Sequence, residues 1–206
     1  MYVGTLFAEA EHAFTENASD VSFYGLSGSA RFMYSNRISY VFDFKGPSFS
    51  VDSACSSSLT ALQQALAAIR AGHCDQAIVG GVNVCLRPAT ALFFHNFKML
   101  SSDGKCKHLD SKASGFVRSE ACSVVFLQRK TCAKRIYATV VHAACNTDGN
   151  KVEGMTFPSW SAQKELFLQT LQEGKIDPLY VEYGEAHGTG TGAGGPLEAR
   201  SIAEAY

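Results

Sequence analysis

The segment formed by residues 48–85 sets the strongest constraint on the fold of this chain. Residues 48–54 read as a buried strand, and residues 56–71 read as a helix that ends at Gly72. Residues 76–85 form a short apolar run, which predicts a strand buried on both faces. A strand, a helix and a second strand joined by a crossover of this length predict parallel pairing and an α/β fold class.

The helix expected over residues 56–71 carries its large apolar side chains, Leu59, Leu62, Leu66 and Ile69, on one face at helical spacing. The same reasoning assigns elements to the rest of the chain. Strands are expected over residues 1–4, 121–127, 136–144 and 179–183, and helices over residues 161–173, closed by Gly174, and 196–205.

The charge and hydropathy of the chain exclude several classes of function. Its 206 residues are 46% hydrophobic and 18% charged with a formal net charge of −1, so no overall basic field exists to attract nucleic acid. No apolar run approaches the roughly 18 residues of a membrane span, and Glu9, Glu11 and His12 do not form the cationic start of a signal peptide. We expect a cytoplasmic protein with no nucleic-acid or membrane partner.

The seven cysteines indicate reduced thiols. Their number is odd, and no C-x-x-C pair occurs. Apart from one candidate nucleophile, we expect them to be mostly buried and to pack as small apolar side chains. A zinc site is the weaker alternative, because neither His73-Cys74 nor Cys106-Lys107-His108 has the paired spacing of a structural zinc site. We therefore expect no metal.

Cys55 is the candidate nucleophile, because it lies where the predicted strand turns into the predicted helix. A thiol at a helix N-terminus faces unpaired backbone N–H groups and the positive end of the helix dipole, which favour the thiolate. A structural cysteine is the alternative for an isolated residue of this kind. The small neighbours Ala54, Ser56, Ser57 and Ser58 favour the catalytic role, because they leave room for an acyl chain. The local signature of papain-like proteases is absent.

His187 is the candidate partner of that nucleophile. It lies in the segment Glu-Ala-His-Gly-Thr-Gly-Thr, residues 185–191, where glycine permits close backbone approach and threonine hydroxyls can hold a polar ligand. A loop histidine without a catalytic role is the alternative. A nucleotide site gets low weight, because the segment matches neither common phosphate-binding motif. Cys55 and His187 together predict an acyl-transfer site.

Several motifs resemble, in order and spacing, the β-ketoacyl synthase domain of condensing enzymes. They are Val-Asp-Ser-Ala-Cys-Ser-Ser-Ser at 51–58, Met-Leu-Ser at 99–101, Gly-Phe-Val-Arg-Ser-Glu at 115–120 and the histidine segment at 185–191. Asn-Arg-Ile-Ser-Tyr at 36–40, Phe-Lys-Gly-Pro-Ser at 44–48 and Asn-Thr-Asp-Gly at 146–149 look most like the animal multifunctional fatty acid synthase. The resemblance covers nearly the whole chain.

This resemblance implies a thiolase-like fold with α/β/α/β/α layers, incomplete at both ends, and a decarboxylative Claisen condensation in fatty acid biosynthesis. Cys55 would accept the acyl group, and malonyl-acyl carrier protein would supply the attacking enolate. His187 would stabilise the enolate oxygen, and Thr189 and Thr191 would contact the pantetheine arm. The backbone N–H of Cys55 would be half of the oxyanion hole.

The resemblance also implies partners and a division of the chain. The strand before the cysteine, residues 48–52 (Ser48 to Asp52), would pair with its copy in a homodimer. Phosphopantetheine on acyl carrier protein would carry the substrate, with no cofactor in the domain itself. The chain would be a partial β-ketoacyl synthase domain, with about 1–130 from the N-terminal half and about 131–206 from the C-terminal half.

The chain departs from the family pattern in several places. The family's catalytic lysine, its second catalytic histidine and its Gly-Phe-Gly-Gly loop are not among the 206 residues, so we expect little condensation by this chain alone. The first strands and helices of the family's N-terminal half are missing too, which leaves neighbours of the sheet uncovered, so we expect poor solubility in isolation. Gly192 and Gly195 replace a larger residue and an aspartate, and Ser114 stands where many relatives carry Asp or Asn. Gly195 is expected to cap the helix at Pro196, with a looser histidine loop.

Two other functions remain open. The ketosynthase domain of a polyketide synthase would share Cys55 and His187. A non-catalytic relative of the same fold would keep Cys55 and His187 but would not catalyse the condensation.

Overall fold

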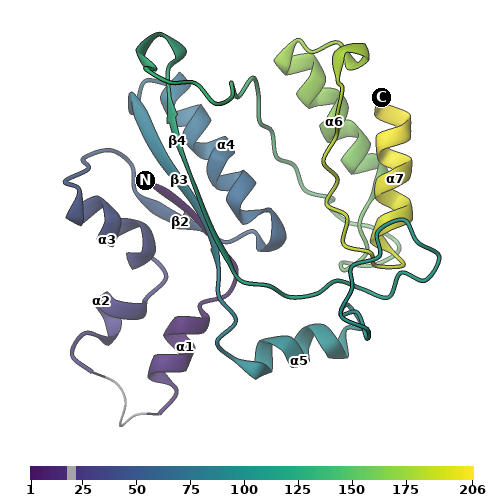
Figure 1. The fold of residues 1–206 in the computed structure, drawn as a ribbon, viewed down its shortest axis with the longest axis horizontal. Coiled ribbons are helices and arrows are strands. Elements are labelled where there is room, and N and C mark those ends of the chain that lie inside the picture. Colours follow the sequence, from purple (N-terminus) through teal and green to yellow (C-terminus); the bar gives the residue numbers. More distant parts are fainter. Residues whose placement is uncertain (18–21) are drawn as a thin grey trace. The chain divides into compact units, whose positions relative to one another are not determined.

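A computed structural model describes residues 1–17 and 22–206, and these residues form two compact units (Figure 1). Unit 1 comprises Met1–Pro88 and Ser119–Ala143, and unit 2 comprises Ala89–Arg118 and Ala144–Tyr206. Each unit is described by itself.

Unit 1 is built on a four-stranded sheet in the order β2-β1-β3-β4. The strands are β1 (Tyr2–Thr5), β2 (Phe49–Val51), β3 (Gln76–Asn83) and β4 (Ala121–Gln128). β1 lies between β2 and β3 and is parallel to both, whereas β4 pairs antiparallel with β3. The parallel α/β unit predicted over residues 48–85 is therefore confirmed, as are the strands at the start of the chain and at 121–127.

Helix α4 (Ser57–Arg70) covers this sheet and confirms the helix expected after Cys55. The apolar side chains that it buries are Ala61, Ala65, Ala68 and Ile69. Of the expected apolar face, Ile69 is therefore buried and Leu62 packs against the core, but Leu59 is 68% exposed. Glycines in the strands explain the difference. A Cβ at Gly4 would lie 2.5 Å from the backbone N of Ser58, so at this point the helix and the sheet are too close for a side chain between them.

Three further helices of unit 1 precede β2, and the sequence analysis did not assign them. They are α1 (Glu9–Thr15), α2 (Gly25–Ser29) and α3 (Met33–Val41). The buried Glu9 carboxylate accepts the backbone N–H groups of Leu86 at 2.6 Å and Arg87 at 2.8 Å. That pair of bonds anchors α1 to the segment after β3.

The strand predicted at 136–144 is wrong. The structure shows no strand there, and the Val141 carbonyl oxygen accepts a hydrogen bond from the side chain of Arg70, through Nη2, at 2.6 Å. β-branched composition favours an extended backbone, but a strand also requires a ladder of hydrogen bonds to a neighbouring strand. No strand of the described residues supplies that ladder.

Unit 2 contains α5 (Pro88–Asn96), α6 (Trp160–Gly174) and α7 (Gly194–Ala205), with α5 beginning at the unit boundary. α6 and α7 pack together: Ser201 Oγ donates to the Trp160 carbonyl oxygen at 2.8 Å, and the Arg200 guanidinium lies 3.6 Å from the centre of the Trp160 ring. The Lys164–Glu204 ion pair at 2.9 Å joins the same two helices.

The helices predicted at 161–173 and 196–205 are confirmed, but their ends are corrected. α6 includes Gly174, the residue that was expected to end it. Its C-cap is Lys175, which adopts the left-handed conformation (φ 53°). α7 begins at Gly194 with Ala193 as N-cap, so Gly195 is a buried helical residue and not the cap.

The strand predicted at 179–183 is also wrong. Residues Pro178–Tyr180 form a 3₁₀ turn, in which Asp177 accepts the backbone N–H of Leu179 at 3.0 Å. Proline at the first position of a turn and an aspartate that caps it favour the tight turn over an extended strand.

The cysteines are more exposed than predicted. All seven are reduced thiols; Cys74 and Cys85 are half-buried and the other five are exposed. Cys122 illustrates the reason, since it lies on β4, where residues 121–126 are exposed on both faces of the strand. The expectation of mostly buried thiols is therefore wrong.

Candidate active site

Cys55 lies in a 3₁₀ turn, Ala54–Ser56, that joins β2 to α4. The helix begins at Ser57 with Ser56 as N-cap, so the thiol lies just before the helix N-terminus, as predicted. The side chain of Cys55 is exposed.

The turn bends sharply at Ala54, whose φ of +56° is in the left-handed region. A non-glycine residue in that region costs about 1–3 kcal/mol and persists only where its surroundings enforce it. Asp52 Oδ1 accepts the Ala54 N–H at 3.2 Å, and Ser57 Oγ donates to the Ala54 carbonyl oxygen at 2.6 Å. Ser57 Oγ also accepts the Ser53 N–H at 2.9 Å, which closes the turn.

Arg31 supports the same turn from the segment before α3. Its Nη1 donates to Asp52 Oδ2 at 2.7 Å, and its carbonyl oxygen accepts the Ser50 hydroxyl at 2.9 Å. Both oxygens of Asp52 are therefore used, one by Arg31 and one by the backbone of Ala54. Neither Asp52 nor Arg31 was singled out from the sequence, because nothing in their spacing indicates that they meet.

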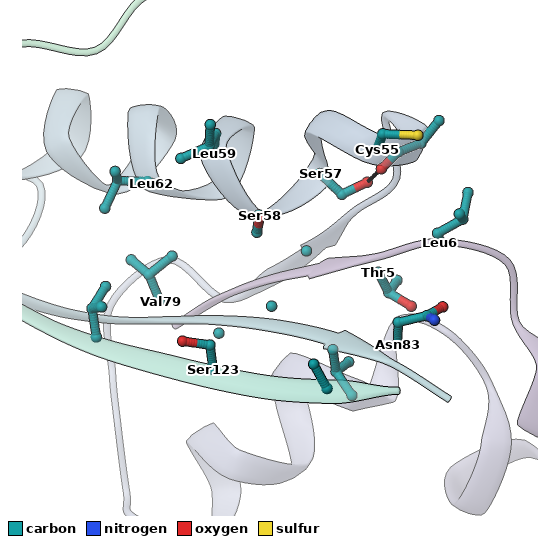
Figure 2. Close-up of a pocket in the computed structure, with 17 residues that line it drawn as sticks. Thr5, Leu6, Cys55, Ser57, Ser58, Leu59, Leu62, Val79, Asn83 and Ser123 are labelled. Atoms are coloured by element: carbon teal, nitrogen blue, oxygen red, sulfur yellow. Dashed lines mark hydrogen bonds between the residues drawn. The ribbon is translucent and has the colours of Figure 1, made fainter. Parts of the chain in front are cut away.

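A pocket of about 440 Å³ opens beside Cys55 between α4 and the sheet (Figure 2). Its volume is in the usual range for small-molecule sites. Its lining is mostly apolar or small and contains no charged side chain. The lining residues labelled in Figure 2 are Thr5, Leu6, Cys55, Ser57, Ser58, Leu59, Leu62, Val79, Asn83 and Ser123. The thiol thus stands in the wall of an apolar cavity within unit 1.

His187 lies in a loop of unit 2 that is fixed by an acidic side chain of α7. The Glu198 carboxylate accepts the backbone N–H of His187 at 2.6 Å through Oε1 and that of Gly188 at 3.0 Å through Oε2. Gly188 and Gly190 have φ values of +63° and +65°, which glycine adopts without strain. Glu198 was not identified from the sequence, although an acidic residue near a helix start is a favourable partner for backbone N–H groups.

Thr189 and Thr191 are directed toward each other in this loop. Their Oγ1 atoms are 3.0 Å apart, and Thr191 Oγ1 accepts the Gly194 N–H at 3.2 Å. The threonines therefore fix the entry to α7. The Gly190 carbonyl oxygen accepts the Gly115 N–H at 3.0 Å, which attaches the histidine loop to the segment at Gly115.

The structure brings together His187, Thr189 and Thr191, which lie in one loop of unit 2, and it places Cys55 in unit 1. Among residues 1–17 and 22–206, no group of three or more His, Cys, Asp or Glu side chains could hold a metal ion. In the same part of the chain, no helix combines the length and the apolar character that crossing a membrane requires.

Two family models match the chain. The model described as "Beta-ketoacyl synthase, N-terminal domain" matches residues 1–133, and "Beta-ketoacyl synthase, C-terminal domain" matches residues 137–206.

The chain is similar to fatty acid synthases and to polyketide synthases. It is 48% identical over 206 residues to a fatty acid synthase from Anser anser anser, covering all of this chain and 58% of that protein. It is 38% identical over 209 residues to the highly reducing polyketide synthase gloL from Glarea lozoyensis, covering 8% of that protein. The chain thus spans little more than half of the first relative and a small part of the second.

Solved ketosynthase domains have the same fold. The oxazolomycin ketosynthase domain OzmH KS7 from a Streptomyces albus strain superposes with a TM-score of 0.91 at 35% identity, covering 99% of this chain and 36% of that one. A ketosynthase of the bacillaene synthase from Bacillus subtilis superposes with a TM-score of 0.86 at 31% identity, covering 99% of this chain and 35% of that one. The predicted thiolase-like α/β fold is confirmed, and the chain belongs to the β-ketoacyl synthase family.

Proposed function

We propose that this chain is the acyl-accepting part of a condensing enzyme of fatty acid synthesis, with Cys55 as its nucleophile. One observation carries the proposal: Cys55 stands at a sharp strand-to-helix turn and in the wall of an apolar pocket of about 440 Å³. An apolar cavity without charged side chains suits a hydrocarbon chain, and the turn exposes the thiol to a thioester at its mouth.

The first half-reaction transfers an acyl group. The Cys55 thiol gives up its proton, and the thiolate attacks the carbonyl carbon of an acyl thioester. A new carbon–sulfur bond forms, the original one breaks, and the phosphopantetheine thiolate of acyl carrier protein leaves and takes up the proton that Cys55 lost. The backbone N–H of Cys55 donates to the carbonyl oxygen as its negative charge develops. No cofactor of the domain takes part in this step.

The second half-reaction forms the new carbon–carbon bond. Malonyl-acyl carrier protein loses CO2, and the electron pair of the broken bond becomes an enolate. His187 donates a hydrogen bond to the enolate oxygen, and Thr189 and Thr191 contact the pantetheine arm. The enolate carbon attacks the acyl thioester on Cys55 and releases the thiolate. The bonds of Glu198 to the His187 loop support this role, because they fix the backbone that carries the imidazole.

The proposal includes a homodimer through residues 48–52 and a cytoplasmic location. β2 supports the dimer, because it is at the end of the strand order and pairs with β1 alone among the described strands. Its other edge is available for a partner strand. The proposed domain is divided into an N-terminal part of about 1–130 and a C-terminal part of about 131–206. Condensation would also require the lysine, the second histidine and the Gly-Phe-Gly-Gly loop of the family.

A polyketide synthase ketosynthase is the second candidate, and the similarity to gloL and to the oxazolomycin domain favours it. The higher identity to the fatty acid synthase favours the first. Comparing acylation by saturated acyl thioesters with acylation by β-hydroxylated ones tests the two candidates: acylation by the saturated thioester alone favours the first, and acylation by both favours the second.

Acyl loading tests the proposed function. The chain is incubated with a saturated acyl thioester, and intact-mass spectrometry follows the adduct in the wild type, in Cys55→Ala and in Cys122→Ala. We expect one acyl adduct that is lost in Cys55→Ala and retained in Cys122→Ala, where another exposed cysteine is removed. A folded wild type without an adduct would support the non-catalytic alternative instead.

A further inference from the structure

We propose that Arg31 and Asp52 are positioning residues that hold the Cys55 turn in its reactive conformation. The inference rests on the proposed function of Cys55 and adds two side chains that do not touch the substrate. It starts from the geometry of one carboxylate, which bonds to a guanidinium through one oxygen and to the backbone of the turn through the other.

The backbone of Ala54 is the element that requires support. At φ +56° the peptide between Ala54 and Cys55 is turned away from the orientation that an alanine would prefer. That peptide carries the N–H of Cys55, and the same backbone sets the direction of the thiol. An acceptor for the Ala54 N–H therefore also orients the two groups of Cys55 that act on a thioester.

Asp52 supplies that acceptor and needs a fixed rotamer to do so. Its side chain is 24% exposed, so water competes for both carboxylate oxygens. The 2.7 Å ion pair with Arg31 fixes the carboxylate through the oxygen that does not bond to the turn. An isolated exposed ion pair contributes little to stability. Here, however, the ion pair orients the Asp52 carboxylate, which also accepts the N–H of Ala54.

Arg31 is itself held at both ends. Its carbonyl oxygen accepts the Ser50 hydroxyl at 2.9 Å on β2, while its guanidinium reaches Asp52 just beyond that strand. The segment before α3 is thereby attached to the strand and to the turn. Displacing the guanidinium should move the carboxylate and leave the sheet in place.

The test compares two reactions of Cys55 in the 206-residue chain. Acylation by a small acyl thioester needs the oriented Cys55 N–H, whereas alkylation by iodoacetamide needs only the thiol. In Arg31→Met and Asp52→Ala we expect acylation at Cys55 to slow by about tenfold to hundredfold, as for a misplaced reacting group, with alkylation changed by less than about threefold. Arg31→Lys should recover part of the acylation rate, because lysine can keep one charged hydrogen bond.

Lys45→Met is the matched control. It removes the cation of another ion pair, with Asp43, before β2 and away from the turn. It should leave both rates unchanged. Equal losses of both rates, or acylation in Arg31→Met at the wild-type rate, would overturn the inference.

A second measurement separates this inference from the proposed function. The amide resonance of Ala54 in ¹⁵N–¹H spectra should move upfield in Arg31→Met and Asp52→Ala and should stay in place in Lys45→Met, because a charged acceptor is weakened only in the first two. A wild type that is not acylated would reject the proposed function, and the Ala54 resonance would still decide the inference. An unmoved resonance would contradict it.

Discussion

Glu198 Oε1 accepts the backbone N–H of His187 at 2.6 Å, and the same carboxylate accepts the Gly188 N–H at 3.0 Å. An α7 side chain therefore determines the conformation of the loop that carries the candidate histidine. Loss of the carboxylate leaves two backbone donors without this acceptor.

We expect Glu198→Ala to reduce the free energy of unfolding by about 2 kcal/mol, within the range for charged hydrogen bonds. Urea unfolding followed by circular dichroism measures the change. Glu165→Ala, at an exposed position of α6, is the control and should change it by less than about 0.5 kcal/mol. Equal stability of the two variants would show that Glu198 does not hold the loop.

The close approach of α4 to the sheet predicts a large effect at Gly4. A Cβ there would lie 2.5 Å from backbone atoms of Ser57 and Ser58, which cannot rotate away. We expect Gly4→Ala to destabilise the chain by about 3 kcal/mol, at the upper end for overpacking. Thermal unfolding measures it.

Gly80→Ala is the control for this prediction. The nearest atom to a Cβ at Gly80 is Cγ2 of Val124 at 3.9 Å, an ordinary contact distance. The free energy of unfolding of Gly80→Ala should differ from that of the wild type by less than about 1 kcal/mol. If Gly4→Ala were as stable as Gly80→Ala, the described packing of α4 on β1 would be wrong.

Asp103 should titrate at an unusually low pH. Hydrogen bonds from Ser101 and Lys107 favour its charged form and lower the pKa of its carboxyl from 3.8 to about 2. The interactions of the folded state therefore contribute stability above pH 3.8, and that contribution is lost as the pH falls toward about 2. Carboxyl ¹³C NMR measures the pKa, and Ser101→Ala should raise it. A titration of Asp103 at the ordinary pKa would contradict these contacts.

Strands and helices with a clear local pattern of apolar residues were predicted correctly from the sequence. The run of residues 76–85 and the helix that starts after Cys55 have local patterns that match their structure, so their positions were predicted nearly to the residue. The predicted apolar face of α4 was right for Ile69 and wrong for Leu59, because the choice of buried face also depends on Gly4 and Gly81 in distant strands.

The two wrongly predicted strands have a common physical cause. Residues 136–144 and 179–183 have strand-like composition, but pairing depends on a neighbouring strand that local composition does not specify. α5 was missed although Pro88 at its first position is a recognised start signal. At the candidate site, Cys55 and His187 were predicted from their motifs, whereas Arg31 and Glu198 act through contacts with residues 21 and 11 positions away, which no local motif specifies.

The reactivity of Cys55 is the central claim, and competitive alkylation measures it most directly. Brief treatment of the folded chain with iodoacetamide at neutral pH, followed by peptide mass mapping, gives the rate for each cysteine. Cys122 and Cys132 are internal references, because they are exposed and lie away from any α-helix N-terminus. We predict that Cys55 reacts at least about tenfold faster than either, since the backbone N–H groups at the N-terminus of α4 favour the thiolate. Reaction of Cys55 at the same rate as these two cysteines, or more slowly, would contradict the account.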